Sequence, residues 1–122
     1  MPATRVVFYR EDDGTVPLLD WLDRLSARGK AKCRVKLARL EELGHELRRP
    51  EADYLRDGIY ELRIGLGGIN YRMLYFFHGT TAAVLSHGLV KKRTVPAKEI
   101  DAAVERSRRF EQDPMRHRYE GS

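Results

Sequence analysis

Three strand-like segments follow one another in the second half of the chain, with only short turns between them. They cover residues 59–64, 71–77 and 82–90, and all are rich in apolar side chains. Glycine-containing turns over residues 65–70 and 78–80 separate them. Because turns this short join antiparallel neighbours, the three segments predict an antiparallel sheet.

A further strand and two helices are predicted before this sheet. Residues 5–9 are β-branched and aromatic, which is typical of a strand. Pro17 suits the first turn of a helix, which we expect Gly29 to break. A second amphipathic helix is predicted over residues 30–43, ending at Gly44. The very short link between these helices predicts an antiparallel helical hairpin.

The remaining segments complete an α+β architecture. Residues 45–56 are expected to be irregular, and a last helix is predicted over residues 97–111. The predicted order is β-α-α-β-β-β-α, with a small antiparallel-rich sheet packed against the helical hairpin and the C-terminal helix. We expect one domain over residues 1–113 and a flexible tail over residues 114–122.

Composition limits the classes of partner and compartment. Of the 122 residues, 42% are hydrophobic and 34% are charged, which is typical of a globular protein, and the net charge of +5 favours polyanionic partners. The single cysteine, Cys33, allows no internal disulfide and fits a reducing compartment. With no signal peptide and no apolar run long enough to span a bilayer, we expect a cytoplasmic protein that does not bind membranes.

Cationic side chains occur in or at the end of all three central strands. Arg63 and Arg72 interrupt apolar runs, and a guanidinium in a strand must face water, a carboxylate or a phosphate. The last strand carries the other members of this set, which are His87, Lys91, Lys92 and Arg93. The set predicts an anion site, and on a basic protein we expect the anion to be a nucleic-acid backbone.

Several motifs together resemble the RelE/ParE toxin superfamily, and most of all its phage-derived HigB-like branch. The resemblance covers residues 6 to about 110. The motifs that carry it are Tyr60-Glu61-Leu62-Arg63, Tyr71-Arg72-Met73-Leu74-Tyr75-Phe76-Phe77, His87-Gly88-Leu89-Val90-Lys91-Lys92 and Pro96-x-x-Glu99. It implies a RelE-like fold.

The resemblance also implies a function. HigB-like and RelE-like proteins are the toxins of type II toxin–antitoxin pairs, and they cleave messenger RNA, typically in the ribosomal A site, without a metal or other cofactor. An antitoxin, often a helix-turn-helix protein, neutralises them, and the pair binds its own operator DNA. ParE-like members share the fold but poison DNA gyrase.

Metal-free RNA cleavage sets clear requirements for the residues of the site. The 2′-hydroxyl of the RNA attacks the adjacent phosphate, so the enzyme must accept a proton, stabilise the added negative charge and protonate the leaving 5′-oxygen. Arg63 and Arg72 are predicted to bind phosphate oxygens, and Lys91 or Lys92 to transfer protons. His87 has a suitable intrinsic pKa for either transfer. His87 and Lys91 have the same strand parity, so a regular strand places them on one face.

Other residues are expected to assist this catalytic set. Glu61 and Glu99 are predicted to orient the cations. Contact with ribosomal RNA is expected from Arg93 and from a basic patch on the second helix, formed by Lys30, Lys32, Arg34 and Lys36. The four histidines are too scattered in sequence for a metal site.

Each of these interpretations has an alternative. Arg63 can simply pair with Glu61 or Glu99, Arg72 can do the same, and His87 can be a structural histidine. The lysines at the strand end and the basic helix can be solvated surfaces without a ligand. At the level of function, the alternatives are a gyrase poison on the same fold and an RNA-binding module without catalytic activity.

Overall fold

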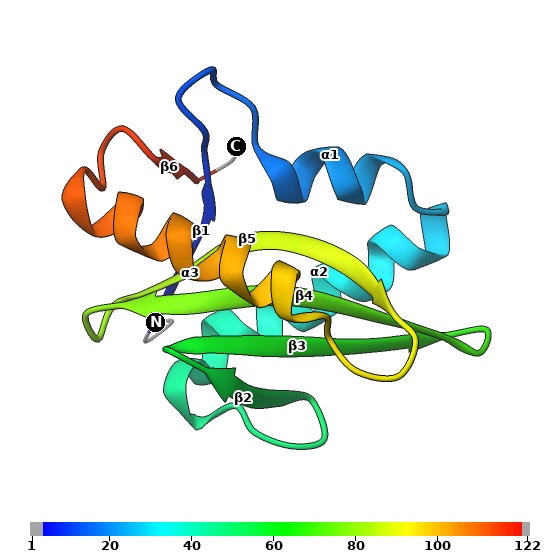
Figure 1. Ribbon diagram of the computed structural model, residues 1–122. Coiled ribbons are helices and arrows are strands. Elements are labelled where there is room, and N and C mark those ends of the chain that lie inside the picture. Colours follow the sequence, from blue (N-terminus) through cyan, green and yellow to red (C-terminus); the bar gives the residue numbers. More distant parts are fainter. Residues whose placement is uncertain (1–3, 121–122) are drawn as a thin grey trace.

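The computed structural model describes residues 4–120 and places helices on both faces of one sheet (Figure 1). In this described range, six strands lie in the order β2-β3-β4-β5-β1-β6; β1 and β5 pair in parallel, and the other neighbours pair antiparallel. Their bounds are β1 Arg5–Tyr9, β2 Ala52–Arg56, β3 Ile59–Leu66, β4 Ile69–His78, β5 Ala82–Lys91 and β6 Arg118–Tyr119. The α+β prediction is therefore confirmed, although β2 and β6 were not predicted.

Three α-helices and one 3₁₀-helix cover this sheet. Their bounds are α1 Pro17–Asp23, α2 Ala27–Leu43, η1 Gly44–Glu46 and α3 Ala97–Gln112. In Figure 1, α3 crosses the front of the sheet, whereas α2 lies behind it. Among the described residues, no helix has the length and apolar character needed to cross a membrane.

The boundary between α1 and α2 differs from the predicted one. Gly29 is buried inside α2, and the helix begins after Ser26, whose side chain accepts a hydrogen bond from the Gly29 amide at 3.1 Å. A serine N-cap satisfies a free amide of the first turn, which glycine cannot do. The predicted end at Gly44 is confirmed, because Gly44 follows the last helical residue with a positive φ of 53°.

A flexible tail was predicted over residues 114–122, but the described part of this segment, up to residue 120, includes a strand that pairs with β1. Strand β6 extends the sheet by pairing Phe8 with Tyr119 and Tyr9 with Arg118. The buried His117 donates from Nδ1 to the Arg10 carbonyl at 2.8 Å, and its ring stacks on Tyr9. Two residues of strand are too short to give a periodic signal in the sequence. Residues 1–3 of the predicted domain and residues 121–122 of the predicted tail lie outside the described part of the chain.

Strand β2 occupies part of the segment that was expected to be irregular. It pairs antiparallel with β3, placing Ala52 opposite Leu62 and Asp53 opposite Glu61. Its sequence, Ala-Asp-Tyr-Leu-Arg, has little β-branched character, so its pairing with β3 outweighs its local propensity.

Two apolar cores lie on opposite faces of the sheet. The core under α1 and α2 includes Leu62, Met73 and Leu85, whereas the core under α3 includes Leu74 and Leu89. This alternation along each strand is what the side-chain period of two requires when both faces are buried.

Cys33 belongs to the core under α1 and α2. Burial raises the pKa of its thiol to about 11, so the thiolate needed for nucleophilic chemistry is scarce at neutral pH.

Gly88 of β5 allows the closest approach between this sheet and α1. A β-carbon built at Gly88 would overlap the indole ring of Trp21, which is almost fully buried and also meets Tyr71 edge to face. The glycine of the His87-Gly88-Leu89 motif therefore has a packing role, because only a residue without a side chain fits beneath Trp21.

We therefore expect Gly88→Ala to lower the free energy of unfolding by about 1–3 kcal/mol, the usual cost of overpacking a core. Urea unfolding followed by tryptophan fluorescence measures this change. Gly65→Ala is the matched control, because Gly65 is also in a strand but has open space around its β-carbon position. Equal stability of the two variants would contradict the packing role of Gly88.

Candidate active site

The register of the central strands brings several predicted site residues to the face covered by α3. Arg63 of β3 lies opposite Arg72 of β4, and Arg72 lies opposite Leu89 of β5. Leu89 belongs to the core under α3, so both arginines project toward this face. His87 lies two residues before Leu89 on the same face and Lys91 two residues after it.

A β-bulge at Ser86 turns His87 toward α3. Tyr75 lies opposite Leu85 and Leu74 lies opposite His87, so β5 has one residue more than β4 between these pairs. Without that extra residue, His87 would pair with Met73 and point toward α1 and α2. Bulges often re-aim a side chain next to a functional site, and this one has no signature in the sequence.

Glu61 forms the centre of the arginine cluster. The residue is only 2% exposed, and its carboxylate accepts from both guanidiniums, from Arg63 Nε at 2.8 Å and from Arg72 Nε at 3.2 Å. Arg63 also donates to Asp53 at 3.2 Å, and Arg72 donates to the Tyr71 carbonyl at 2.9 Å. A buried carboxylate needs positively charged hydrogen-bond donors to offset its loss of hydration, and the two arginines provide them. The predicted orienting role of Glu61 agrees with this geometry.

The two arginines differ in how much of each guanidinium is accessible. Arg72 is 7% exposed as a residue, whereas 29% of the Arg63 side chain is exposed. Arg72 is therefore held mainly by the protein, while Arg63 has an open side from which it can reach an anion. Asp53, which the sequence did not single out, fixes the other side of Arg63.

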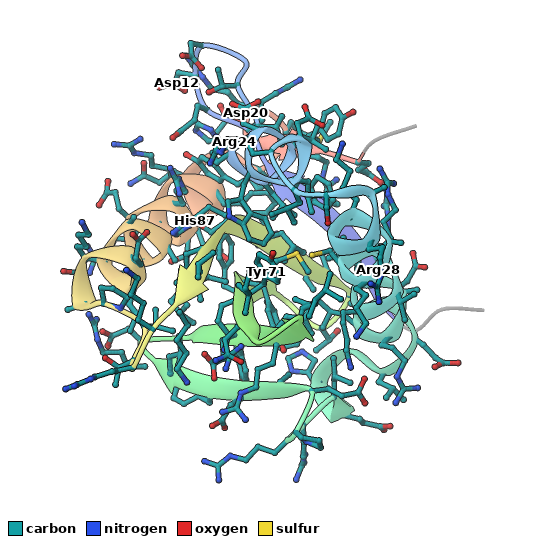
Figure 2. All side chains as sticks on the ribbon, turned by 90° about the vertical axis from the view of Figure 1, so that its right-hand side faces the viewer. Asp12, Asp20, Arg24, Arg28, Tyr71 and His87 are labelled. Atoms are coloured by element: carbon teal, nitrogen blue, oxygen red, sulfur yellow. The ribbon has the colours of Figure 1, made fainter. Side chains whose placement is uncertain are left out.

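His87 lies in a second polar cluster, between β5 and α3 (Figure 2). Its Nε2 lies 2.8 Å from Glu99 Oε1, while its Nδ1 lies 2.8 Å from Ser86 Oγ and 3.1 Å from Arg106 Nη1. Arg106 can only donate, so Nδ1 must be the acceptor and the neutral imidazole carries its proton on Nε2, facing Glu99.

Burial is the main influence on the pKa of His87. It lowers the pKa below the ordinary value, the hydrogen bond to Glu99 acts in the opposite direction, and the positive charge of Arg106 lowers the pKa further. His87 is therefore held in its neutral form at physiological pH.

No pattern in the sequence connects this second cluster with the N-terminal loop. Arg106 donates to Glu11 at 3.2 Å across 95 positions of sequence, and Ser86 owes its place to the bulge. Only the folded sheet brings Glu11, Ser86 and Arg106 around His87.

The cations that follow β5 are more accessible than this cluster. Lys91 is partly buried at the strand end, and Lys92 and Arg93 are exposed in the loop before α3. Within residues 4–120, none of the three forms an ion pair. They are thus available to a polyanion at the same end of the strands as Arg63.

The basic patch predicted on α2 lies on the other face of the sheet. Lys32 donates to the Gly65 carbonyl at 3.0 Å, and Lys36 pairs with Glu51 at 3.2 Å. Hydrogen bonds from Arg39 and then Lys36 lower the pKa of Glu51 to about 2. Lys30 and Arg34 form no ion pair with another described residue. The structure therefore separates this patch from the residues that were predicted to be catalytic, and Glu51 neutralises part of its charge.

Figure 2 shows the same separation at the end of the sheet. His87 lies beside α3, whereas Arg28, at the start of α2, lies on the opposite side of the molecule. Among the described residues, no three histidine, cysteine, aspartate or glutamate side chains gather in a way that could hold a metal ion.

The environment of His87 predicts a specific pH dependence of stability. Because the pKa of His87 is lower in the folded state, the unfolded chain binds a proton first as the pH falls through about 6.5. Between pH 7.5 and 5.5 this group should remove at most about 1.4 kcal/mol of stability. Urea unfolding at both pH values measures the loss.

Two variants isolate the contribution of His87. We expect His87→Gln to lose less stability on acidification than the wild type, because the titrating group is gone. We expect Glu99→Gln to lose more, because the hydrogen bond that raises the pKa is weakened. An unchanged pH dependence in His87→Gln would show that the proton is taken up elsewhere.

Comparison with known families gives one match. The family model described as phage-derived protein Gp49-like (DUF891) matches residues 20–108, a range that contains the arginine cluster and His87. No curated protein matches the chain. Because the family match spans most of the sequence, the protein belongs to the Gp49-like family of phage-derived proteins, a toxin-like family of the RelE type.

Proposed function

We propose that the protein is the toxin of a type II toxin–antitoxin pair, of the HigB-like branch, and that it cleaves messenger RNA on the ribosome. The observation that carries this proposal is the placement of Arg63, His87 and Lys91 on one face of three adjacent strands. Membership of a toxin-like family supports it independently.

The proposed reaction needs no cofactor. The 2′-hydroxyl attacks the adjacent phosphorus and loses its proton to a basic group of the protein, and the bond to the 5′-oxygen breaks as that oxygen gains a proton. The products are a 2′,3′-cyclic phosphate and a 5′-hydroxyl, so atoms and charge balance without water or a metal. Stabilising the dianionic phosphorane is the main electrostatic task.

Exposure and hydrogen bonding suggest how the site residues divide this task. Arg63 binds the phosphate through its open side, and Lys91 and Lys92 supply positive charge and proton transfer. Arg72 neutralises part of the charge of Glu61 and helps to hold the carboxylate that orients Arg63. His87 keeps a positioning role at the end of β5, because its Nδ1 lone pair already accepts hydrogen bonds.

The proposal also includes the partners of the protein. Arg93 and the cations of α2, which are Lys30, Lys32, Arg34 and Lys36, contact ribosomal RNA away from the cleaved bond. A cognate antitoxin, of the helix-turn-helix class, blocks the basic face, and the pair binds operator DNA.

Induced expression in bacteria, followed by primer-extension mapping of cellular messages, tests the proposal. We expect new 5′ ends confined to translated regions with the wild type, and their loss with Arg63→Ala and with Lys91→Ala. Arg5→Ala is the control, because Arg5 is an exposed cation at the opposite end of the strands. This control should cleave as the wild type does.

The other outcomes separate the alternatives. Growth arrest with DNA damage and intact messages would contradict the nuclease and indicate a gyrase poison. Cleavage that persists in both site variants would contradict the proposed residues. A soluble, folded wild type that neither arrests growth nor cleaves messages would indicate a binding module without catalytic activity.

A further inference from the structure

A cavity lies at the edge of the sheet formed by β2, next to Asp53 of the arginine cluster. It has a volume of about 480 Å³ and opens to solvent. The residues that define its character are His45, Arg48, Arg49, Asp53, Tyr54 and Tyr60. Aromatic rings and guanidiniums around one opening are the chemistry that recognises an unstacked nucleobase and its phosphate.

Tyr54 provides an exposed but fixed aromatic face. Its residue is 52% exposed, yet its hydroxyl accepts a hydrogen bond from the Gly58 amide at 3.0 Å. The ring meets Tyr60 edge to face at 5.0 Å, and Tyr60 stacks in turn on the buried Tyr75 at 5.4 Å. An aromatic ring that is held at both its edge and its hydroxyl loses little conformational entropy when a base stacks on it.

The cations of the cavity are arranged to meet a phosphate. Arg48 is exposed and forms no ion pair with another residue in the range 4–120. Arg49 donates to Asp53 at 2.9 Å, and the same Asp53 oxygen accepts from Arg63 at 3.2 Å.

Tyr54 lies opposite Tyr60, on the face covered by α2, whereas Asp53 lies opposite Glu61, on the face covered by α3. Asp53 therefore connects the cavity to the candidate active site across the edge of the sheet formed by β2.

We propose that this cavity binds one nucleotide of a single-stranded RNA that passes around the β2 edge of the sheet, so that the neighbouring phosphates lie over Arg63 on the other face. Tyr54 stacks on the base, and Arg48 and Arg49 bind its phosphate. This inference rests on the proposed function for the identity of the RNA as a substrate, but it concerns binding and not cleavage. A duplex does not fit, because a paired base cannot expose its face to Tyr54.

The test is the affinity of the intact protein for a short, fluorescently labelled single-stranded RNA with methylated 2′-hydroxyl groups, which cannot be cleaved. We expect Tyr54→Leu to weaken binding about tenfold, within the range found for loss of one base–aromatic stack. Tyr54→Phe is the matched control, because it retains the stacking ring and removes only the hydroxyl that accepts from Gly58, so it should keep most of the affinity that Tyr54→Leu loses. Arg48→Gln should weaken binding and reduce its salt dependence.

Unchanged affinity in Tyr54→Leu, or no RNA binding by the wild type, would overturn the inference. Adenosine monophosphate provides a second probe. If it binds the protein while Tyr54→Leu leaves the RNA affinity unchanged, the cavity would be assigned to free nucleotides instead. Weakened RNA binding in Tyr54→Leu without message cleavage in cells would leave the cavity in place and remove the proposed nuclease. Message cleavage in cells together with unchanged RNA affinity in Tyr54→Leu would support the nuclease and remove the proposed nucleotide site.

Discussion

A single buried carboxylate organises the face of the sheet on which the candidate site lies. Glu61 accepts hydrogen bonds from Arg63 on its own strand and from Arg72 on the next. One carboxylate thus pairs with the positive charges of two guanidiniums. Removing a buried ion from water costs several kcal/mol unless its partners are in place. The arrangement fixes the two arginines and thereby decides which part of each remains free for a ligand.

The same sheet separates two tasks between its faces. The face under α1 and α2 is a packed core in which Trp21 lies directly over Gly88. The face under α3 combines an apolar centre with the two polar clusters, and the bulge at Ser86 moves His87 onto it. The one extra residue in β5 thus places His87 on the face of the candidate site, whereas a regular strand would place it in the core under α1 and α2.

Much of the architecture follows from local sequence, and the parts that do not have physical reasons. The central strands and α3 have long apolar patterns, and the His87–Lys91 parity holds because β5 is regular beyond the bulge. Strand β2 and strand β6 depend on pairing with distant partners. The pairing of Arg63 and Arg72 with Glu61 was an open alternative in the sequence, because an ion pair and a phosphate place the same demand on a guanidinium in a strand.

The central claim is that Arg72 serves the fold whereas Arg63 remains available for chemistry. Comparing the free energies of unfolding of Arg72→Gln and Arg63→Gln tests it most directly. The account predicts that Arg72→Gln costs about 3–5 kcal/mol, because both ions of the Arg72–Glu61 pair are buried. It predicts a smaller cost for Arg63→Gln, because the Arg63 end of its pair with Glu61 is partly exposed to solvent. Equal costs, or a larger cost for Arg63→Gln, would contradict this division of roles.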